Sequence, residues 1–287
     1  MIRKTNPQDL PALQAFLQPR VATSLFLSGN LNDHGLNATG HNTATQFWIA
    51  ESDGIIQAVF GSSEAGYLMC EAPDFDPGWS TDLRHAMAGR QVIGLSGEVG
   101  QATAFRVALG LDDHPASFED VEPHFLLQLD DLIIPDGTTQ LRAPTDADLP
   151  QLVAWRCAYD REVFGEEDTA ENRYKSQQRV SDLVQNGRLR LLTHQNTPVA
   201  MTGFNAALPE IVQIGSVWTP PEFRGQGHAR RALALHLDEA RSQGVKSAVL
   251  FASGPAAVRA YQSIGFSQIG EYAQVAFADP FILGAPA

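Results

Sequence analysis

A short glycine-rich segment between an apolar stretch and a helical stretch is the clearest place for chemistry in this sequence. It reads Arg224-Gly225-Gln226-Gly227-His228-Ala229 and follows the β-type run 211–218. A strand, a glycine-rich turn and a helix N-terminus in that order leave backbone N–H groups that can hold a phosphate. Both glycines let an anion come close, and Gly227 can adopt backbone angles that a branched residue cannot. Alone, the segment is also compatible with a tight strand-to-helix connection.

Two common nucleotide-binding patterns are excluded by the residue types. Arg230 stands where G-x-G-x-x-G needs its last glycine, and G-x-x-x-x-G-K-[ST] does not occur in the sequence. The segment therefore predicts neither a Rossmann dinucleotide site nor a P-loop.

A second segment downstream has helical spacing and a candidate proton donor. Gly254 and Pro255 can start a helix, and Gly265 can end it in a left-handed cap. Ala257 and Tyr261 then share one face. Without further context, Tyr261 is equally a tyrosine that packs its ring against a sheet.

Together the two segments resemble the GCN5-related N-acetyltransferase (GNAT) family. The loop of its motif A reads [RQ]-x-x-G-x-[GA], matched by Arg224, Gly227 and Ala229. Motif B resembles the later segment, and its matching residues are Ala257, Tyr261, Gly265 and Phe266. Many relatives have Asn where Gly254 stands, so one side-chain hydrogen bond to the coenzyme arm would be missing here.

The resemblance implies an α/β (α+β) fold, a mixed, mostly antiparallel twisted sheet flanked by helices, with acetyl-CoA as co-substrate. It assigns the pantetheine arm and the pyrophosphate to motif A, and the rest of the site to the later segment. The residues concerned are Val217, Trp218 and Thr219 for the arm, Arg224, Gly225, Gln226, Gly227, His228 and Ala229 for the pyrophosphate, and Ser253, Ala257 and Tyr261 from the later segment.

The implied reaction moves an acyl group from a thioester to an amine, so a proton must leave the amine and the departing thiolate gains from one. Tyr261 is the candidate acid, and a backbone N–H of Val217 or Trp218 is the candidate oxyanion donor. Glu162, which shares a helix face with Trp155 and Tyr159, is the candidate base. Glu210 and a water chain are alternatives.

No metal is expected. His228 and His236 are eight residues apart on one predicted helix, and the other histidines show no ligand spacing. Cys70 and Cys157, the only cysteines, lie in apolar stretches and predict buried thiols rather than a disulfide or metal framework.

Charge and length point to two domains of different character. Of 287 residues, 1–139 carry 6 Lys and Arg against 18 Asp and Glu, whereas the rest carry 14 against 15. The acidity argues against a nucleic-acid surface, and no run is apolar and long enough for a membrane span. The N-terminus lacks the apolar core of a secretion signal, so we expect a cytoplasmic protein.

The turn-forming cluster 135–139 predicts a boundary between a domain at 1–138 and a domain at 139–287. Both open with Asp-Leu-Pro-x-Leu, at residues 9–13 and 148–152, and a helix is expected to follow through Leu149 and Trp155. In both, strands come first and helices and strands then alternate. The expected strands are 46–51, 54–62, 66–71, 91–96, 124–134, 188–194, 198–207, 210–218, 246–252 and 269–277, with helices at 80–88, 99–109, 226–243 and 256–264.

The first half is expected to be a degenerate GNAT-like domain. The segment that corresponds to the coenzyme loop, 72–80, lacks the motif and has Asp74 and Asp76 where they would repel a pyrophosphate. The late helix near 101–111 offers no tyrosine. This half could wall the acceptor site or simply support its neighbour.

The sequence thus predicts an N-acetyltransferase that uses acetyl-CoA and a small-molecule or peptide amine. A protein that binds acyl-CoA as a sensor or scaffold, without catalysis, is the alternative.

Overall fold

The computed structural model describes residues 1–284 of the chain, which forms two compact units. Unit 1 comprises Met1–Glu122 and the chain from Gly270 onward, and unit 2 comprises Pro123–Ile269. Within the described residues, no helix combines the length and the apolar character that crossing a membrane requires.

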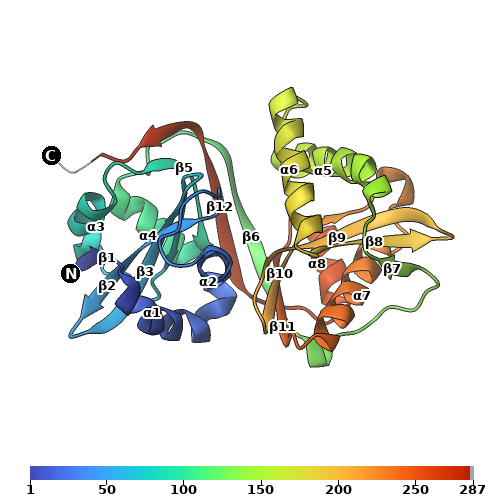
Figure 1. Cartoon of the computed structure of the whole chain (residues 1–287), viewed down its shortest axis with the longest axis horizontal. Helices are drawn as coiled ribbons and strands as arrows, with labels where there is room; N and C mark the ends of the chain where they lie inside the picture. Colours follow the sequence, from blue (N-terminus) through green and yellow to red (C-terminus); the bar gives the residue numbers. More distant parts are fainter. Residues whose placement is uncertain (285–287) are drawn as a thin grey trace. The chain divides into compact units, whose positions relative to one another are not determined.

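Unit 1 is built on strands in the order β1-β2-β3-β4-β5-β12 (Figure 1). Its bounds are β1 Ile2–Lys4, β2 Thr45–Ser52, β3 Ile55–Ser63, β4 Tyr67–Glu71, β5 Gln91–Glu98 and β12 Ser267–Ile282. Only β4 and β5 pair in parallel among these neighbours. The predicted mixed, mostly antiparallel sheet is therefore confirmed.

Four helices cover the two faces of this sheet. They are α1 Leu10–Leu17, α2 Val21–His34, α3 Ser80–Met87 and α4 Val99–Leu109. Successive side chains of a strand point to opposite faces. Accordingly, Trp48 of β2 lies in the core beneath α3 and α4, whereas the next buried residue, Ile49, lies in the core beneath α1 and α2.

Unit 2 repeats the plan with strands in the order β6-β11-β10-β9-β8-β7. The bounds are β6 Ala116–Gln128, β7 Gln140–Arg142, β8 Leu189–His194, β9 Thr197–Ala207, β10 Ile211–Trp218 and β11 Ser247–Phe251. Again a single neighbouring pair, β10 and β11, is parallel.

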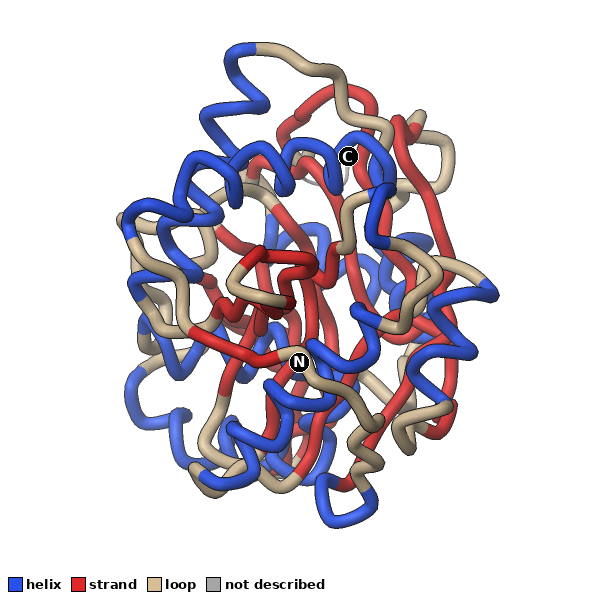
Figure 2. The backbone as a smooth tube through the Cα atoms, turned by 90° about the vertical axis from the view of Figure 1, so that its right-hand side faces the viewer, coloured by secondary structure: helices blue, strands red, loops and turns tan. Residues whose placement is uncertain are grey.

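The helices of unit 2 also divide between two faces. They are α5 Leu149–Phe164, α6 Ala170–Gln185, α7 His228–Ser242 and α8 Pro255–Gln262. Leu233 of α7 packs in one core with Ile214 of β10, and Leu152 of α5 packs in another with Trp218. In the tube view, helices lie on both sides of the strands (Figure 2).

The compact units do not follow the predicted boundary at residues 138 and 139. Strand β6 begins in unit 1, and its residues 124–128 pair with β11 in unit 2. Strand β12 begins in unit 2, and from Tyr272 to Ile282 it pairs with β5 in unit 1. The predicted boundary was placed at a turn in the chain, whereas the division into two compact units depends on which strands pair with each other. A division of roles between the two halves stays a prediction.

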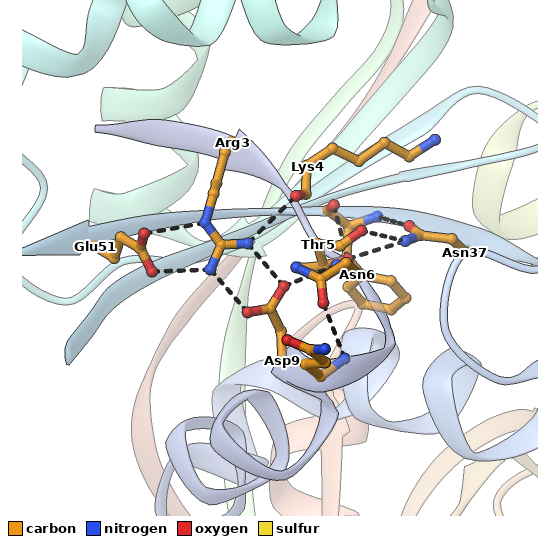
Figure 3. Close-up of polar contacts among 9 residues, drawn as sticks. Arg3, Lys4, Thr5, Asn6, Asp9, Asn37 and Glu51 are labelled. Atoms are coloured by element: carbon orange, nitrogen blue, oxygen red, sulfur yellow. Dashed lines mark hydrogen bonds and ion pairs between the residues drawn. The ribbon is translucent and has the colours of Figure 1, made fainter. Parts of the chain in front are cut away.

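The Asp-Leu-Pro-x-Leu repeat marks the same corner in both units. In unit 1, Arg3 of β1 donates two 2.7 Å hydrogen bonds to the Asp9 carboxylate, which also accepts from the backbone N–H of Asn6 (Figure 3). Its apolar member, Leu13, is fully buried.

In unit 2 every part of this corner recurs 139 residues later. Arg142 of β7 donates two 2.7 Å hydrogen bonds to Asp148, which accepts from the backbone N–H of Thr145, and Leu152 is fully buried. Each carboxylate joins a strand to a helix start through a bidentate charged contact and a capping box. The repeat is therefore structural and not a chance match.

Most predicted elements agree with the structure to within a few residues. The expected strand 124–134 instead begins at Ala116 and ends at Gln128, because the chain turns into a short 3₁₀ helix at Leu129–Asp131. Helix α7 begins at His228 instead of residue 226, because Gly227 has a left-handed backbone. Helices α2 and α6 were not predicted.

Candidate functional site

Strand β10 is irregular where it approaches the glycine-rich loop. Gly215 pairs with Gly203 of β9, but Trp218 pairs with Met201, so β10 contains one residue more than β9 over this stretch. Ser216 absorbs it with a φ of 55°, the left-handed region that a side chain rarely adopts. The strand therefore bulges just before the loop, a feature that often re-aims groups beside active sites.

Strands β10 and β11 stop pairing before β10 reaches the bulge at Ser216. Their parallel pairing runs from Ile211 opposite Ser247 to Gln213 opposite Val249. Both strands continue beyond the last pair, β10 to Trp218 and β11 to Phe251. Backbone groups past this point lie outside the ladder between the two strands, as expected of a strand that splays to admit a ligand.

The glycine-rich loop leads directly into helix α7, whose N-terminus has no side-chain cap. Gly225 and Gly227 have φ values of 76° and 77°, and a side chain at Gly225 would meet nothing within 4 Å. Helix α7 has no side-chain cap, and its first intrahelical bond runs from Arg231 N–H to the Gly227 carbonyl. The preceding N–H groups have no carbonyl partner within the helix and carry the positive end of its dipole. This arrangement suits an anion.

Arg224 holds the entrance of the loop in place. Its guanidinium donates hydrogen bonds to the Thr219 carbonyl at 3.0 Å and to the Glu162 carboxylate at 2.9 Å. It also lies 4.8 Å from the centre of the Trp218 ring. These contacts turn the Arg224 side chain back onto the protein, and a pyrophosphate contact at this residue stays a prediction.

The predicted residues of the pantetheine arm point their side chains inward. Val217 packs against the same core as Ala257 and Tyr261, whereas Trp218 is buried in the core beneath α5 with Trp155. They can serve a ligand through their backbone groups. The Oγ1 of Thr219 is buried without a hydrogen-bond partner among the described residues.

Helix α8 begins and ends where predicted from its glycines and proline. Gly254 caps it, Pro255 is its first residue, and Gly265 has a φ of 107°. A side chain at Gly265 would come within 2.7 Å of the Asp131 carbonyl, so only glycine fits without a shift. Tyr261 is half-buried in the last turn, and its ring meets Phe266 edge-on at 6.1 Å.

The remaining predicted coenzyme residues differ in exposure. Gln226 and Ser253 are exposed, and Ala229 is half-buried. His228 is buried at the start of α7, and its pKa is lowered by burial and by the nearby His194. It is thus held neutral, so its imidazole would not add positive charge to the anion site.

The structure separates the two carboxylates considered as bases. Glu162, half exposed on α5, is ion-paired with Arg224 beside the loop. Glu210 precedes the opposite end of β10 and is ion-paired with Lys246, about 20 Å along the strand from Ser216. Glu210 is therefore too far away to serve. The role of Glu162 as base stays a prediction.

Sequence reasoning missed a polar cluster beneath the bulge. Arg156 of α5 donates a hydrogen bond to the Ser216 hydroxyl at 2.8 Å and another to the Asp160 carboxylate. Asp160 also accepts a hydrogen bond from the Ser176 hydroxyl of α6. Arg179 of α6 also belongs to this cluster. Because α6 was not predicted, nothing in the sequence alone indicated that these side chains meet.

The corresponding place in unit 1 is closed. After β4, the Asp76 carboxylate accepts from the Gly78 N–H at 2.8 Å, which occupies a donor that an external anion would need. Phe75 and Trp79 pack their rings edge-on against Phe60, at 6.1 and 6.2 Å between centroids, and so fix the loop onto the core. Among residues 1–284, no cluster of three or more His, Cys, Asp or Glu could hold a metal ion.

In unit 2, a bulged and splayed strand leads through left-handed glycines into an uncapped helix, an arrangement that can accept an anion. Residues 149–266 match the family described as "Acetyltransferase (GNAT) family". These residues therefore match the family that the two motifs predicted.

A curated relative is similar to the chain over a short stretch. "Acetyltransferase Atu2258" of Agrobacterium fabrum is 39% identical over 54 residues, which is 19% of this chain. The chain spans only 39% of the length of that relative.

Solved structures share the fold across the whole chain. A GNAT-family acetyltransferase from Colwellia psychrerythraea covers 96% of this chain and 99% of its own, with a TM-score of 0.55 and 15% identity. A GCN5-related N-acetyltransferase from Kribbella flavida covers 91% and 95%, with a TM-score of 0.56 and 16% identity. A tandem GNAT protein from the clavulanic acid biosynthesis pathway covers 98% and 99%, with a TM-score of 0.53 and 14% identity. At these identities the likeness establishes the fold alone.

Proposed function

We propose that unit 2 transfers the acetyl group of acetyl-CoA to a primary amine by direct attack within a ternary complex. The observation that carries the proposal is the continuous course from the bulge at Ser216 through Gly225 and Gly227 to the uncapped start of α7. A splayed strand can pair with an extended amide arm, and the helix start can hold its phosphates.

The residues that would hold acetyl-CoA fall into two groups. Backbone groups of Val217, Trp218 and Thr219 would pair with the amide arm. The segment from Arg224 to Ala229 would enclose the pyrophosphate, and Ser253 and Ala257 would border the arm from the side of α8. Val217 and Ala257 pack against one core, which supports their placement at one site.

When bound, acetyl-CoA supplies an acetyl thioester. The amine nitrogen forms a bond to the carbonyl carbon, the bond from carbon to sulfur breaks, the nitrogen loses a proton to Glu162 or to a water chain, and the thiolate gains one. Tyr261 is proposed to donate that proton from the last turn of α8. A backbone N–H of Val217 or Trp218 is proposed to stabilise the carbonyl oxygen as it becomes negative.

Unit 1 is proposed to have no coenzyme site. Its loop is capped by its own Asp76 and packed through Phe75 and Trp79 on Phe60. A role for this unit as a wall of the acceptor site is a further proposal. Removing it is a poor test, because β12 belongs to its sheet and β6 to that of unit 2.

The proposed function is tested by release of free thiol from acetyl-CoA in the presence of a panel of amines. We expect amine-dependent release with formation of the acetylated amine. Tight binding of acetyl-CoA with no amine-dependent release from any amine would instead support a sensor or scaffold.

A further inference from the structure

Two guanidinium groups lie beneath the bulged end of β10. Arg156 contacts the Ser216 hydroxyl at 2.8 Å. Arg179 of α6 donates a hydrogen bond to the Oδ1 of Asn205 in β9, at 2.8 Å. The Asn205 side chain lies across Gly215, because a side chain placed at Gly215 would come within 2.0 Å of the Asn205 amide nitrogen. Arg179 is thereby held one residue away from the bulge.

The cluster contains more positive than negative charge. Its buried carboxylate, Asp160, is paired with Arg156 at 2.7 Å and accepts a hydrogen bond from Ser176. Asp182, on the surface one turn along α6 from Arg179, forms no ion pair with it. Within residues 1–284, the hydrogen-bond partner of Arg179 is the neutral amide of Asn205, which uses one of its five N–H donors.

A partly buried guanidinium without a carboxylate partner destabilises the folded protein unless an anion binds to it. Arg179 is half-buried, and burial together with the neighbouring Arg156 lowers its pKa to about 10. It still carries its proton at neutral pH. A desolvated cation without a carboxylate partner destabilises a fold, so it marks a place where an anion would be bound with gain.

We propose that the acceptor amine carries a carboxylate and that Arg179 binds this carboxylate beside the bulge of β10. The inference rests on the proposed acetyltransferase function and names its substrate class. The planar guanidinium fork matches a carboxylate with two parallel hydrogen bonds. Asn205 would act as a positioning residue that fixes the fork, and Arg156 would remain committed to Asp160 and Ser216.

The coenzyme does not account for this charge. Its phosphates have their own site at the start of α7, and the chain reaches that loop only after Trp218, about 10 Å along the strand from Gly215. An anion beneath the bulge therefore belongs to the second substrate.

The test compares matched amines in the thiol-release assay with the full chain. L-amino acids, the corresponding amino acid amides and O-phosphoethanolamine serve as probes. We expect kcat/KM for acids to exceed that for amides by about 10–100-fold, as for loss of a charged hydrogen-bond pair. Arg179→Gln should bring the ratio of acid to amide close to one, and Arg179→Lys should leave a reduced ratio because it keeps the charge without the fork.

Arg173→Gln is the matched control, because Arg173 is an exposed arginine on the same helix that pairs with Asp168. It should leave the ratio unchanged, and binding of acetyl-CoA to each variant by calorimetry confirms folding. Equal use of acids and amides, or preference for the phosphorylated amine, would overturn the inference while leaving the proposed function intact.

Calorimetry with the L-amino acids distinguishes failure of the proposed reaction from failure of the carboxylate site. Arg179-dependent binding of an acid without thiol release would keep the carboxylate site and overturn the proposed reaction. Absence of both binding and release would overturn both.

Discussion

The ends of β10 and β4 occupy the same place in two copies of one plan, but their pairing with the preceding strand differs. Each strand pairs in parallel with its neighbour over three residues. The register of β10 with β9 then shifts, and Ser216 takes a left-handed backbone. The register of β4 with β3 runs without a shift from Leu68 to Glu71.

The groups that follow these strands deepen the difference. In unit 2 they are two glycines with left-handed backbones, and a side chain at Gly225 would meet nothing within 4 Å. In unit 1 the Oε1 of Gln101 accepts the Ala72 N–H at the end of β4, and the Nε2 of Gln101 lies 3.5 Å from the buried Glu71 carboxylate. A side chain of unit 1 thus takes up a backbone donor just beyond the strand end. The comparison shows that a fold can be kept while a few residues open or close its site.

The largest effect is expected from Tyr261→Phe. Loss of a positioned proton donor should lower kcat by about 10²–10⁴, with little change in the affinity for acetyl-CoA. Unit 1 has no tyrosine on α4 at the comparable place. Steady-state kinetics with a fixed amine measure the effect, and unchanged turnover would remove Tyr261 from the mechanism.

Gly225→Val should raise the KM for acetyl-CoA by about 10–100-fold, because it strains the loop and obstructs charged hydrogen bonds to the phosphates. Gly54→Val is a matched control in unit 1. Gly54 has a φ of 75° against 76° for Gly225, and neither position has a neighbour within 4 Å. Both variants should lose similar stability, and only the first should lose affinity. A similar KM change in both would mean that strain alone explains it.

Asp9→Asn and Asp148→Asn break the repeated corner in unit 1 and unit 2. Each removes a bidentate charged contact and one side of a capping box, so each should lower the free energy of unfolding by about 1–2 kcal/mol. Denaturant unfolding of both variants makes the comparison. A loss confined to one variant would show that the corners are alike in geometry but not in energy.

Two buried groups should give the units opposite responses to pH. Burial and repulsion from Asp120 raise the pKa of Glu122 in unit 1 to about 7, from 4.5. The folded state therefore holds more protons, and this contribution to stability falls as the pH rises from about 4.5 to 7. Burial lowers the pKa of His236 in unit 2 to about 3, from 6.5, so its contribution falls as the pH drops below about 6.5.

Glu122→Gln should therefore be more stable than the unmodified protein at pH 8, and this advantage should shrink toward pH 4.5. Thermal unfolding across this range measures it. A constant difference between the two proteins would contradict the assigned pKa.

The sequence was sufficient for most elements and for the conformation of the glycine-rich loop, because both depend on local signals. Gly225 and Gly227 have the left-handed angles that their residue type permits, and Gly254, Pro255 and Gly265 delimit α8 as their types indicate. The polar cluster could not be predicted in the same way. Arg156, Arg179 and Ser216 lie on three elements, and their proximity depends on how α5 and α6 pack on the sheet.

The exchange of strands between the units escaped prediction for a similar reason. A turn at 135–139 is a local signal, whereas the pairing of β12 with β5 joins residues about 180 positions apart. Hydrogen-bond partners at such a separation leave no pattern within either segment. The ion pair between Glu162 and Arg224 is likewise a long-range contact, over 62 positions.

Titration calorimetry with acetyl-CoA tests the central claim most directly, because it counts coenzyme sites. We expect one site per chain, strongly weakened by Gly225→Val and unaffected by Gly54→Val. Two sites per chain, or undiminished binding in Gly225→Val, would contradict the assignment of a single coenzyme site to the end of β10.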